Sequence, residues 1–215
     1  MNAPLRTRIK FCGMQSAADV ALAVEAGADA VGVIVAESPR RVAPADITKI
    51  SAAIPPFVDR IGVVAHTHDD DATSLLKRGF TLQFSGEELP STCEAISQGR
   101  PYIKAFHIRA GVTYEPADFD ELGAYTNATW MFDSRVDDRL GGTGVPFMWS
   151  VVASVAKRRP IVVSGGLTPE NVGACVRAVR PYAVDVRGGV ETSDRKDFDK
   201  MRAFVRAVRE ADAEA

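Results

Sequence analysis

Short apolar segments alternate with segments of helical spacing along almost all of the 215 residues, and this alternation constrains the fold most. Residues 161–163 are all apolar and β-branched, which is typical of a strand that is buried on both faces of a parallel sheet. Residues 16–26 have helical spacing, with Ser16 as the expected N-cap and Gly27 just beyond the end. Strands and helices that alternate in this way predict right-handed β-α-β units.

The repeated unit can be followed through the whole chain. We expect strands over residues 9–12, 30–35, 60–65, 80–84, 102–107, 129–133, 161–164 and 183–186. We expect helical segments over residues 16–26, 44–53, 69–78, 90–97, 117–125, 147–156, 169–179 and 198–210, with Thr168 as the cap of the seventh. Eight units close a barrel more naturally than they extend an open sheet, so the predicted fold is an α/β (β/α)8 barrel, or TIM barrel. No linker interrupts the series, which predicts a single domain over residues 1–215.

Composition and charge exclude several classes of protein. The formal net charge of −2 offers no positive surface for nucleic acid or for an acidic membrane. No apolar run approaches the roughly 20 residues that span a bilayer, and the first residues lack the apolar stretch of a signal peptide. The cysteines Cys12, Cys93 and Cys175 are odd in number and far apart, which is typical of a protein of the reducing cytoplasm.

Three glycine-rich segments follow the sixth, seventh and eighth expected strands. In a TIM barrel the active site lies at the carboxyl ends of the strands, and the loops after the last two strands usually bind phosphate. Glycines let backbone N–H groups approach an anion closely. The segments therefore predict a phosphate site, although each could also be a tight turn that needs positive φ. The residues concerned are Gly142, Thr143, Gly144, Gly165, Gly166, Gly188 and Gly189.

Cys12 and Asp133 also stand at the carboxyl ends of expected strands. An unpaired cysteine is commonly a small buried hydrophobic residue, but Cys12 ends a strand and precedes Gly13. Asp133 ends an apolar strand, where a buried carboxylate would be costly, and its alternative role is a loop cap. A thiol and a carboxylate that face each other across a barrel mouth can act as an acid–base pair. Position alone leaves both interpretations open for each residue.

The residues around these positions form a series of motifs in a fixed order. The motifs are Lys-Phe-Cys-Gly at 10–13, Glu-Ala-Gly-Ala-Asp-Ala-Val-Gly at 25–32, Ser-Pro-Arg-Arg-Val at 38–42, Phe-Asp-Ser at 132–134, Gly-Gly-Thr-Gly at 141–144 and Ser-Gly-Gly-Leu-Thr-Pro-Glu-Asn-Val at 164–172. With these motifs the chain resembles the phosphoribosylanthranilate isomerases over nearly its whole length. The resemblance implies a TIM-barrel isomerase of tryptophan biosynthesis.

The resemblance also implies a reaction, the Amadori rearrangement of N-(5'-phosphoribosyl)anthranilate to 1-(2-carboxyphenylamino)-1-deoxyribulose 5-phosphate. It assigns the general acid to Asp133, the general base to Cys12 and recognition of the anthranilate carboxylate to Arg40. The implied partner is a small-molecule sugar phosphate, with no metal, organic cofactor, nucleic acid or membrane. The expected assembly is a monomer or a homodimer.

Several positions depart from the family pattern. Ser85 replaces the histidine of the Q-L-H-G motif. Val145 and Met148 replace the lysine and the aspartate of the G-T-G-K-x-F-D-W motif. Arg187 stands in the loop after the eighth strand, where it could bind the phosphate or a second anionic group of the substrate. A solvent-pointing side chain is the alternative interpretation of Arg187.

The departures keep two other functions open. One is an enzyme of the same family that acts on another phosphorylated aminosugar, and the other is a non-catalytic sugar-phosphate binder. Retention of Cys12 and Asp133 disfavours the binder, because a protein that only binds has no need of an acid–base pair. His66 and His68 lie close together in the sequence, but two histidines without a third ligand are weak support for a metal site.

Overall fold

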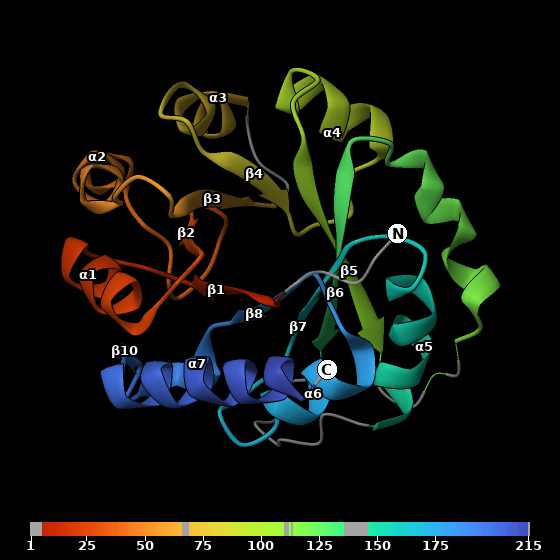
Figure 1. Ribbon diagram of the computed structural model, residues 1–215. Coiled ribbons are helices and arrows are strands. Elements are labelled where there is room, and N and C mark those ends of the chain that lie inside the picture. The colour runs from red at the N-terminus through yellow and green to blue at the C-terminus, as the bar shows by residue number, and fades with distance from the viewer. Residues whose placement is uncertain (1–5, 66–68, 110–111, 113, 136–145, 215) are drawn as a thin grey trace. The chain divides into compact units, whose positions relative to one another are not determined.

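The computed structural model describes residues 6–65, 69–109, 112, 114–135 and 146–214 (Figure 1). Eight strands form a closed barrel in the order in which they occur along the chain. The strands are β1 (Arg8–Cys12), β2 (Ala30–Ile34), β3 (Asp59–Val64), β4 (Thr81–Phe84), β5 (Tyr102–Arg109), β6 (Ala128–Arg135), β7 (Ile161–Ser164) and β8 (Ala183–Val186). The pairings from β1 to β5 and from β6 to β8 are parallel, and the predicted (β/α)8 barrel is confirmed.

Helical segments separate the strands as the alternation predicts. The α-helices are α1 (Ala17–Ala26), α2 (Pro44–Ala53), α3 (Asp69–Lys77), α4 (Pro90–Ser97), α5 (Pro146–Ala156), α6 (Val172–Val179) and α7 (Phe198–Ala213). Two segments are 3-10 helices, η1 (Pro116–Ala124) and η2 (Gly188–Val190). A short antiparallel hairpin of β9 (Glu191–Thr192) and β10 (Arg195–Lys196) lies between η2 and α7, and the sequence did not predict it.

The chain divides into two compact units. Within the described residues, the first unit holds 10–105 and 124–129, and the second unit holds the remaining residues. The single domain over residues 1–215 stays a prediction. None of the helices in the described part of the chain combines the length and the apolar character that a bilayer crossing requires.

In the first unit, α1 to α4 lie outside the strands that they follow (Figure 1). The strand register sets Cys12 opposite Gly32 and Ile34 opposite Val63, so alternate side chains of neighbouring strands share one face. The expected caps of α1 are confirmed. Ser16 accepts a hydrogen bond from the backbone N–H of Asp19, and Gly27 ends the helix with a φ of 105°.

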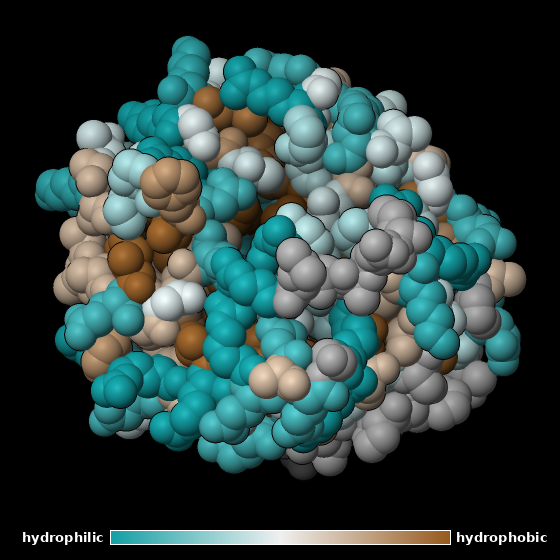
Figure 2. All heavy atoms as spheres, in the orientation of Figure 1, coloured by the Kyte–Doolittle hydropathy of each residue, from teal (hydrophilic) through white to brown (hydrophobic). Residues whose placement is uncertain are grey.

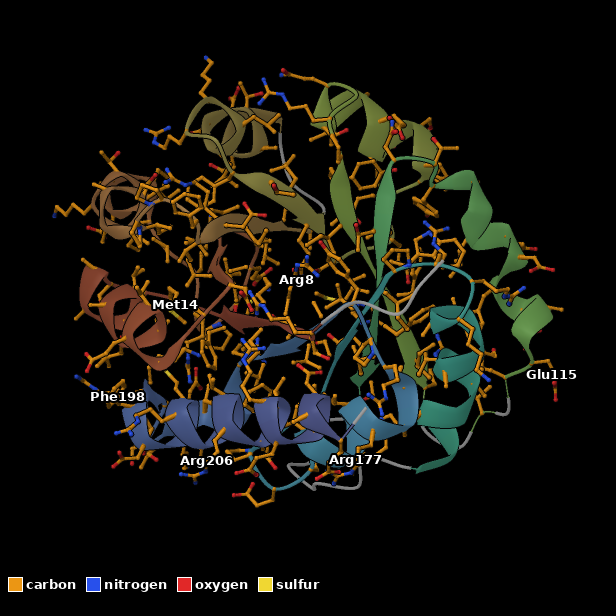
Figure 3. The ribbon with its side chains drawn as sticks, in the orientation of Figure 1. Arg8, Met14, Glu115, Arg177, Phe198 and Arg206 are labelled. Carbon is orange, nitrogen blue, oxygen red and sulfur yellow. The ribbon has the colours of Figure 1, made fainter. Side chains whose placement is uncertain are left out.

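In the second unit, α7 carries a regular stripe of buried residues. Met201, Phe204 and Val208 are fully buried at helical spacing, and α7 packs against α6. Arg206 and the α6 residue Arg177 point away from the strands (Figure 3), and the surface over α7 is largely hydrophilic (Figure 2). Helix α7 is therefore amphipathic, with one buried apolar face and one hydrophilic face toward solvent.

The expected helix over residues 169–179 begins later than predicted. Helix α6 starts at Val172 with Asn171 as the N-cap residue, so the prediction that Thr168 is the cap is wrong. The backbone N–H of Thr168 donates to Asn171 Oδ1 over 2.8 Å, and Asn171 Nδ2 donates to the carbonyl of Gly166 over 2.9 Å. These bonds fold residues 168–171 into a turn before the helix can begin.

Candidate active site

Cys12 ends β1 and is packed among apolar side chains of the first unit. The residue is only 6% exposed and belongs to a cluster with Ile34, Ala36 and Val63. Its neighbour across the sheet is Gly32, where a Cβ atom would lie 2.9 Å from the Cys12 Sγ. The missing side chain at Gly32 therefore makes room for the thiol.

Lys10 shares this space with Cys12, because residues two apart on a strand point to the same face. Lys10 is buried, and a Cβ atom at Gly32 would lie 3.0 Å from the Lys10 Nζ. The ammonium group and the Cys12 Sγ are therefore separated by no more than about 6 Å. The space at Gly32 is therefore bordered by a thiol and by an ammonium group.

Asp133 lies near the carboxyl end of β6, which continues to Arg135, in a more polar environment within the second unit. Its side chain is 27% exposed, and its Oδ2 lies 4.0 Å from the Nδ1 of His107 on β5. The register sets Asp133 opposite Ser164 on β7. A Cβ atom at the next residue, Gly165, would lie 2.6 Å from the Asp133 Oδ1. The carboxylate is therefore bounded by His107 on one side and by Gly165 on the other.

Gly165 and Gly166 follow β7 and have different surroundings. Gly165 has a φ of 89°, and a side chain there would overlap the backbone of Ser134. The Ser134 hydroxyl donates to the Gly165 carbonyl over 3.0 Å, which fixes this close approach. Gly166 has a φ of 62°, with no described atom within 4 Å of the place that a Cβ would take. Gly165 is thus required for packing, whereas Gly166 borders open space.

The two glycines of the loop after β8 differ in the same way. A side chain at Gly189 would overlap the backbone of Leu167, whereas no described atom lies within 4 Å of a Cβ at Gly188. Loops after β7 and β8 therefore touch each other at Gly189, and their other glycines, Gly166 and Gly188, leave backbone exposed. Such open backbone can approach an anion closely.

Arg187 precedes these glycines and is exposed. Its carbonyl accepts a hydrogen bond from the Nζ of Lys196 over 3.3 Å. The Lys196 side chain is 2% exposed and forms an ion pair of 2.8 Å with Glu191. The β9–β10 hairpin therefore holds the backbone of the loop after β8. This ion pair was not predicted from the sequence, because the spacing of Glu191 and Lys196 does not indicate a hairpin.

Arg40 lies in the loop after β2 and is partly buried. Its backbone N–H donates to the Ser38 hydroxyl over 3.1 Å. The Val42 N–H donates to the carbonyl of Ile34 over 2.8 Å, so the loop returns to the end of its own strand. This closure holds Arg40 near the carboxyl end of β2.

The loop after β4 contains the substituted residue Ser85. Gln83 is buried and its Nε2 donates to the Ser85 hydroxyl over 3.0 Å. The Lys104 Nζ donates to the Gly86 carbonyl and pairs with Glu88 over 3.1 Å, both side chains being at most 7% exposed. A buried ion pair therefore holds this loop in place, and the sequence analysis did not anticipate it.

Other expected site residues lie outside the described residues. They are Gly142, Thr143 and Gly144, together with Val145, His66 and His68. Within the described ranges, no group of three or more His, Cys, Asp and Glu side chains is arranged to hold a metal ion.

Cys93 and Cys175 are packing residues. Both side chains are fully buried in helices, α4 and α6. Burial raises the pKa of the Cys93 thiol to about 11 and the pKa of the Cys175 thiol to about 12. Neither thiol is ionised at neutral pH.

Comparison with known proteins tests the resemblance directly. A family model described as N-(5'-phosphoribosyl)anthranilate (PRA) isomerase matches residues 9–207. The chain belongs to this family. A curated PRA isomerase from Pseudomonas fluorescens (strain SBW25) is 42% identical over 207 residues, which cover 94% of this chain and 95% of the relative.

Solved structures of PRA isomerases have the same fold. A crystal structure of phosphoribosyl anthranilate isomerase from Thermotoga maritima matches with a TM-score of 0.83 and 33% identity, covering 95% of this chain and 99% of that one. Another PRA isomerase structure, in complex with reduced 1-(o-carboxyphenylamino)-1-deoxyribulose 5-phosphate, matches with a TM-score of 0.79 and 32% identity, covering 95% and 99%. The chain is therefore similar to PRA isomerases in sequence and in fold over nearly its full length.

Proposed function

We propose that this chain is the PRA isomerase of tryptophan biosynthesis, with Cys12 as the general base and Asp133 as the general acid. Membership of the family supports the activity. The observation that carries the two roles is that Cys12 at the end of β1 and Asp133 near the end of β6 each lie beside a glycine that makes room for the side chain, Gly32 or Gly165. Strand ends on this side are where TIM-barrel enzymes place reacting groups.

The reaction needs one proton donor and one proton acceptor. Asp133 gives a proton to the ring oxygen of the ribose, the bond from that oxygen to the anomeric carbon breaks, and the anthranilate nitrogen forms an iminium with that carbon. The Cys12 thiolate then takes the proton from the neighbouring sugar carbon, and the electron pair of that bond forms the enolamine. Protonation of the former anomeric carbon and loss of the hydroxyl proton give the ketone product. The sum is an isomerisation, because every proton that leaves is matched by one that enters.

The phosphate is assigned to the loops after β7 and β8. Gly166 and Gly188 border open space, so their backbone can approach phosphate oxygens, while Gly165 and Gly189 set the path of the loops. Gly142, Thr143 and Gly144, which lie outside the described residues, stay predicted contacts of the phosphate. We assign to Arg187 a charge-assisted hydrogen bond to the phosphate.

The anthranilate carboxylate is assigned to Arg40. A guanidinium group can bind a carboxylate with two parallel hydrogen bonds, which fixes both the position and the plane of the ligand. Two hydrogen bonds within the loop between Ser38 and Val42 and to the end of β2 support this assignment, because they hold the Arg40 backbone beside that strand end.

A second substrate is favoured by one specific observation. Gln83 and Ser85 form a hydrogen-bonded pair in the loop after β4, where the family motif has a histidine. Hydroxyl and amide groups suit a polar neutral substituent, so a different phosphorylated aminosugar is the alternative substrate. A monomer or homodimer and a cytoplasmic location remain predictions.

Complementation of a tryptophan auxotroph that lacks the isomerase tests the proposal. We expect growth without tryptophan, and we expect the purified protein to convert PRA to the deoxyribulose product in chromatographic assays. A well-expressed, folded protein that neither supports growth nor converts PRA would overturn the assignment and favour the alternative substrate.

A further inference from the structure

His107 lies beside the carboxylate of Asp133. The two residues come from the neighbouring strands β5 and β6 (Figure 1), and both belong to the second unit. The distance from His107 Nδ1 to Asp133 Oδ2 is 4.0 Å, and each side chain is 27% exposed. The two groups are therefore close enough to interact.

The opposite side of the carboxylate is fixed by backbone. A Cβ atom at Gly165 would lie 2.6 Å from Oδ1, and Gly165 itself is held by the hydrogen bond of 3.0 Å from Ser134. The parallel pairing of Asp133 with Ser164 fixes the backbone of β6 against β7 at this residue. Oδ1 thus meets a rigid surface, whereas Oδ2 meets a side chain that can move.

We propose that His107 is a positioning residue for Asp133, whose imidazole holds the carboxyl group in the orientation that donates the proton to the ring oxygen. The proposal rests on the proposed function. A rotation of the two side chains that shortens the separation by about 1 Å brings Nδ1 and Oδ2 to hydrogen-bond distance. Such contacts are commonly long in a free enzyme and tighten when substrate binds.

The chemistry explains why a carboxyl group at this place needs a second partner. Asp133 is partly exposed, and a carboxyl group that is open to solvent can exchange hydrogen bonds with water and rotate. A misplacement of about 1 Å can cost roughly a hundredfold in rate. An imidazole anchored on β5 replaces that water, with a direction fixed by the strand. Residue 107 lies outside the motifs that carry the family resemblance.

Two substitutions of His107 distinguish a positioning role of its imidazole from a role in packing. His107→Phe keeps a ring of similar size and removes both nitrogens, while His107→Asn keeps a polar atom near the place of Nδ1. We expect His107→Phe to lower kcat about ten- to a hundred-fold with KM within about two-fold of the parent. His107→Asn should recover most of that loss. Arg109→Ala, two residues further along β5 and exposed, is the matched control and should keep the parent rate.

A double-mutant cycle with Asp133→Asn decides the mechanism. If His107 acts through Asp133, His107→Phe costs almost nothing more in the Asp133→Asn background. Two results would overturn the proposal and leave the isomerase assignment intact. One is a double variant whose loss of kcat equals the product of the two single losses, and the other is a His107→Phe enzyme with the parent rate. A parent protein that does not convert PRA would instead overturn the assigned function before the cycle begins. Thermal unfolding checks each variant, and His107→Ala takes the place of His107→Phe in the cycle if the latter does not fold.

Discussion

The surroundings of Cys12 and of Asp133 differ, although each residue lies at or near the carboxyl end of a strand of the barrel. Cys12 is 6% exposed and packs against Ile34 and Val63. The Asp133 side chain is 27% exposed and lies beside His107. A thiol resembles a small hydrophobic residue and tolerates apolar packing, whereas a carboxylate in the same place would lose its hydration without compensation. Each environment suits the group that it holds.

The two regions make room for these groups in the same way but with different rigidity. Gly32 leaves space that is lined by side-chain ends, the Sγ of Cys12 and the Nζ of Lys10. Gly165 leaves space that is lined by the backbone of Ser134. Side-chain ends can shift by a few tenths of an ångström at little cost, but backbone in a paired strand cannot. We therefore infer that the Asp133 region tolerates substitution less well than the Cys12 region.

The largest expected effects come from removing the two reacting groups. Cys12→Ala and Asp133→Asn should each lower kcat by about 10²- to 10⁴-fold, because each removes a proton transfer, while KM changes little. Steady-state kinetics with PRA measure both constants. Cys93→Ala and Asp120→Asn are matched controls, since Cys93 is buried in α4 and Asp120 is exposed in η1.

The kinetics of these variants can contradict the role assigned to either residue. A Cys12→Ala enzyme within about a factor of two of the parent would show that Cys12 is a packing residue like Cys93. An Asp133→Asn enzyme that changes only in thermal stability would reduce Asp133 to a structural cap.

The second prediction concerns the rigid space at Gly165. Gly165→Ala puts a side chain at a φ of 89° and into the backbone of Ser134. We expect it to lower the free energy of unfolding by about 2–4 kcal/mol, from backbone strain and overpacking together. Denaturant unfolding measures this change. Gly166→Ala shares the positive φ without the overlap, so it should cost less than half as much; equal losses would show that the backbone angle alone matters.

Much of this arrangement follows from sequence, because it depends on local pattern. The strands over 161–164 and 183–186 and the caps of α1 have the predicted bounds. Cys12, Asp133 and the glycines after β7 and β8 could be selected as candidates since a barrel brings its strand ends to one side. Helix α6 begins later than predicted, because the Asn171 side chain bonds to the loop rather than leaving Thr168 to cap the helix.

What could not be predicted depends on contacts between distant parts of the chain. His107 and Asp133 belong to separate strands, and no spacing rule fixes the rotamers that bring Nδ1 toward Oδ2. The difference between Gly165 and Gly166 is also tertiary, because it depends on where the backbone of Ser134 passes. The ion pair that secures the β8 loop requires a hairpin that carries no clear turn signal.

The third prediction sharpens the comparison by separating binding from chemistry. Arg187→Ala should weaken the binding of inorganic phosphate and of product analogues by about ten- to a hundred-fold, because a hydrogen bond to a charged group contributes roughly 1.5–3 kcal/mol. Turnover at saturating substrate should persist, in contrast to Asp133→Asn. Calorimetry measures both affinities. Arg206→Ala on α7 is the matched control, since Arg206 is exposed and points away from the strands (Figure 3). Equal phosphate affinities in parent and Arg187→Ala would exclude a contact between Arg187 and the phosphate.

The smallest expected effect tests the adaptable space at Gly32. Gly32→Ala introduces a Cβ atom 2.9 Å from the Cys12 Sγ and 3.0 Å from the Lys10 Nζ, both ends of side chains. Gly32 is not among the glycines with positive φ, so an alanine adds no backbone strain there. We expect a loss of about 1 kcal/mol or less in the free energy of unfolding, because the thiol and the ammonium group can move aside. The displaced base should nevertheless slow turnover by roughly ten-fold, since proton transfer is sensitive to small displacements. Steady-state kinetics and denaturant unfolding on one protein preparation separate the two quantities. A Gly32→Ala enzyme that loses as much stability as Gly165→Ala would show that the space around Cys12 is rigid as well, and the contrast between the two regions would fail.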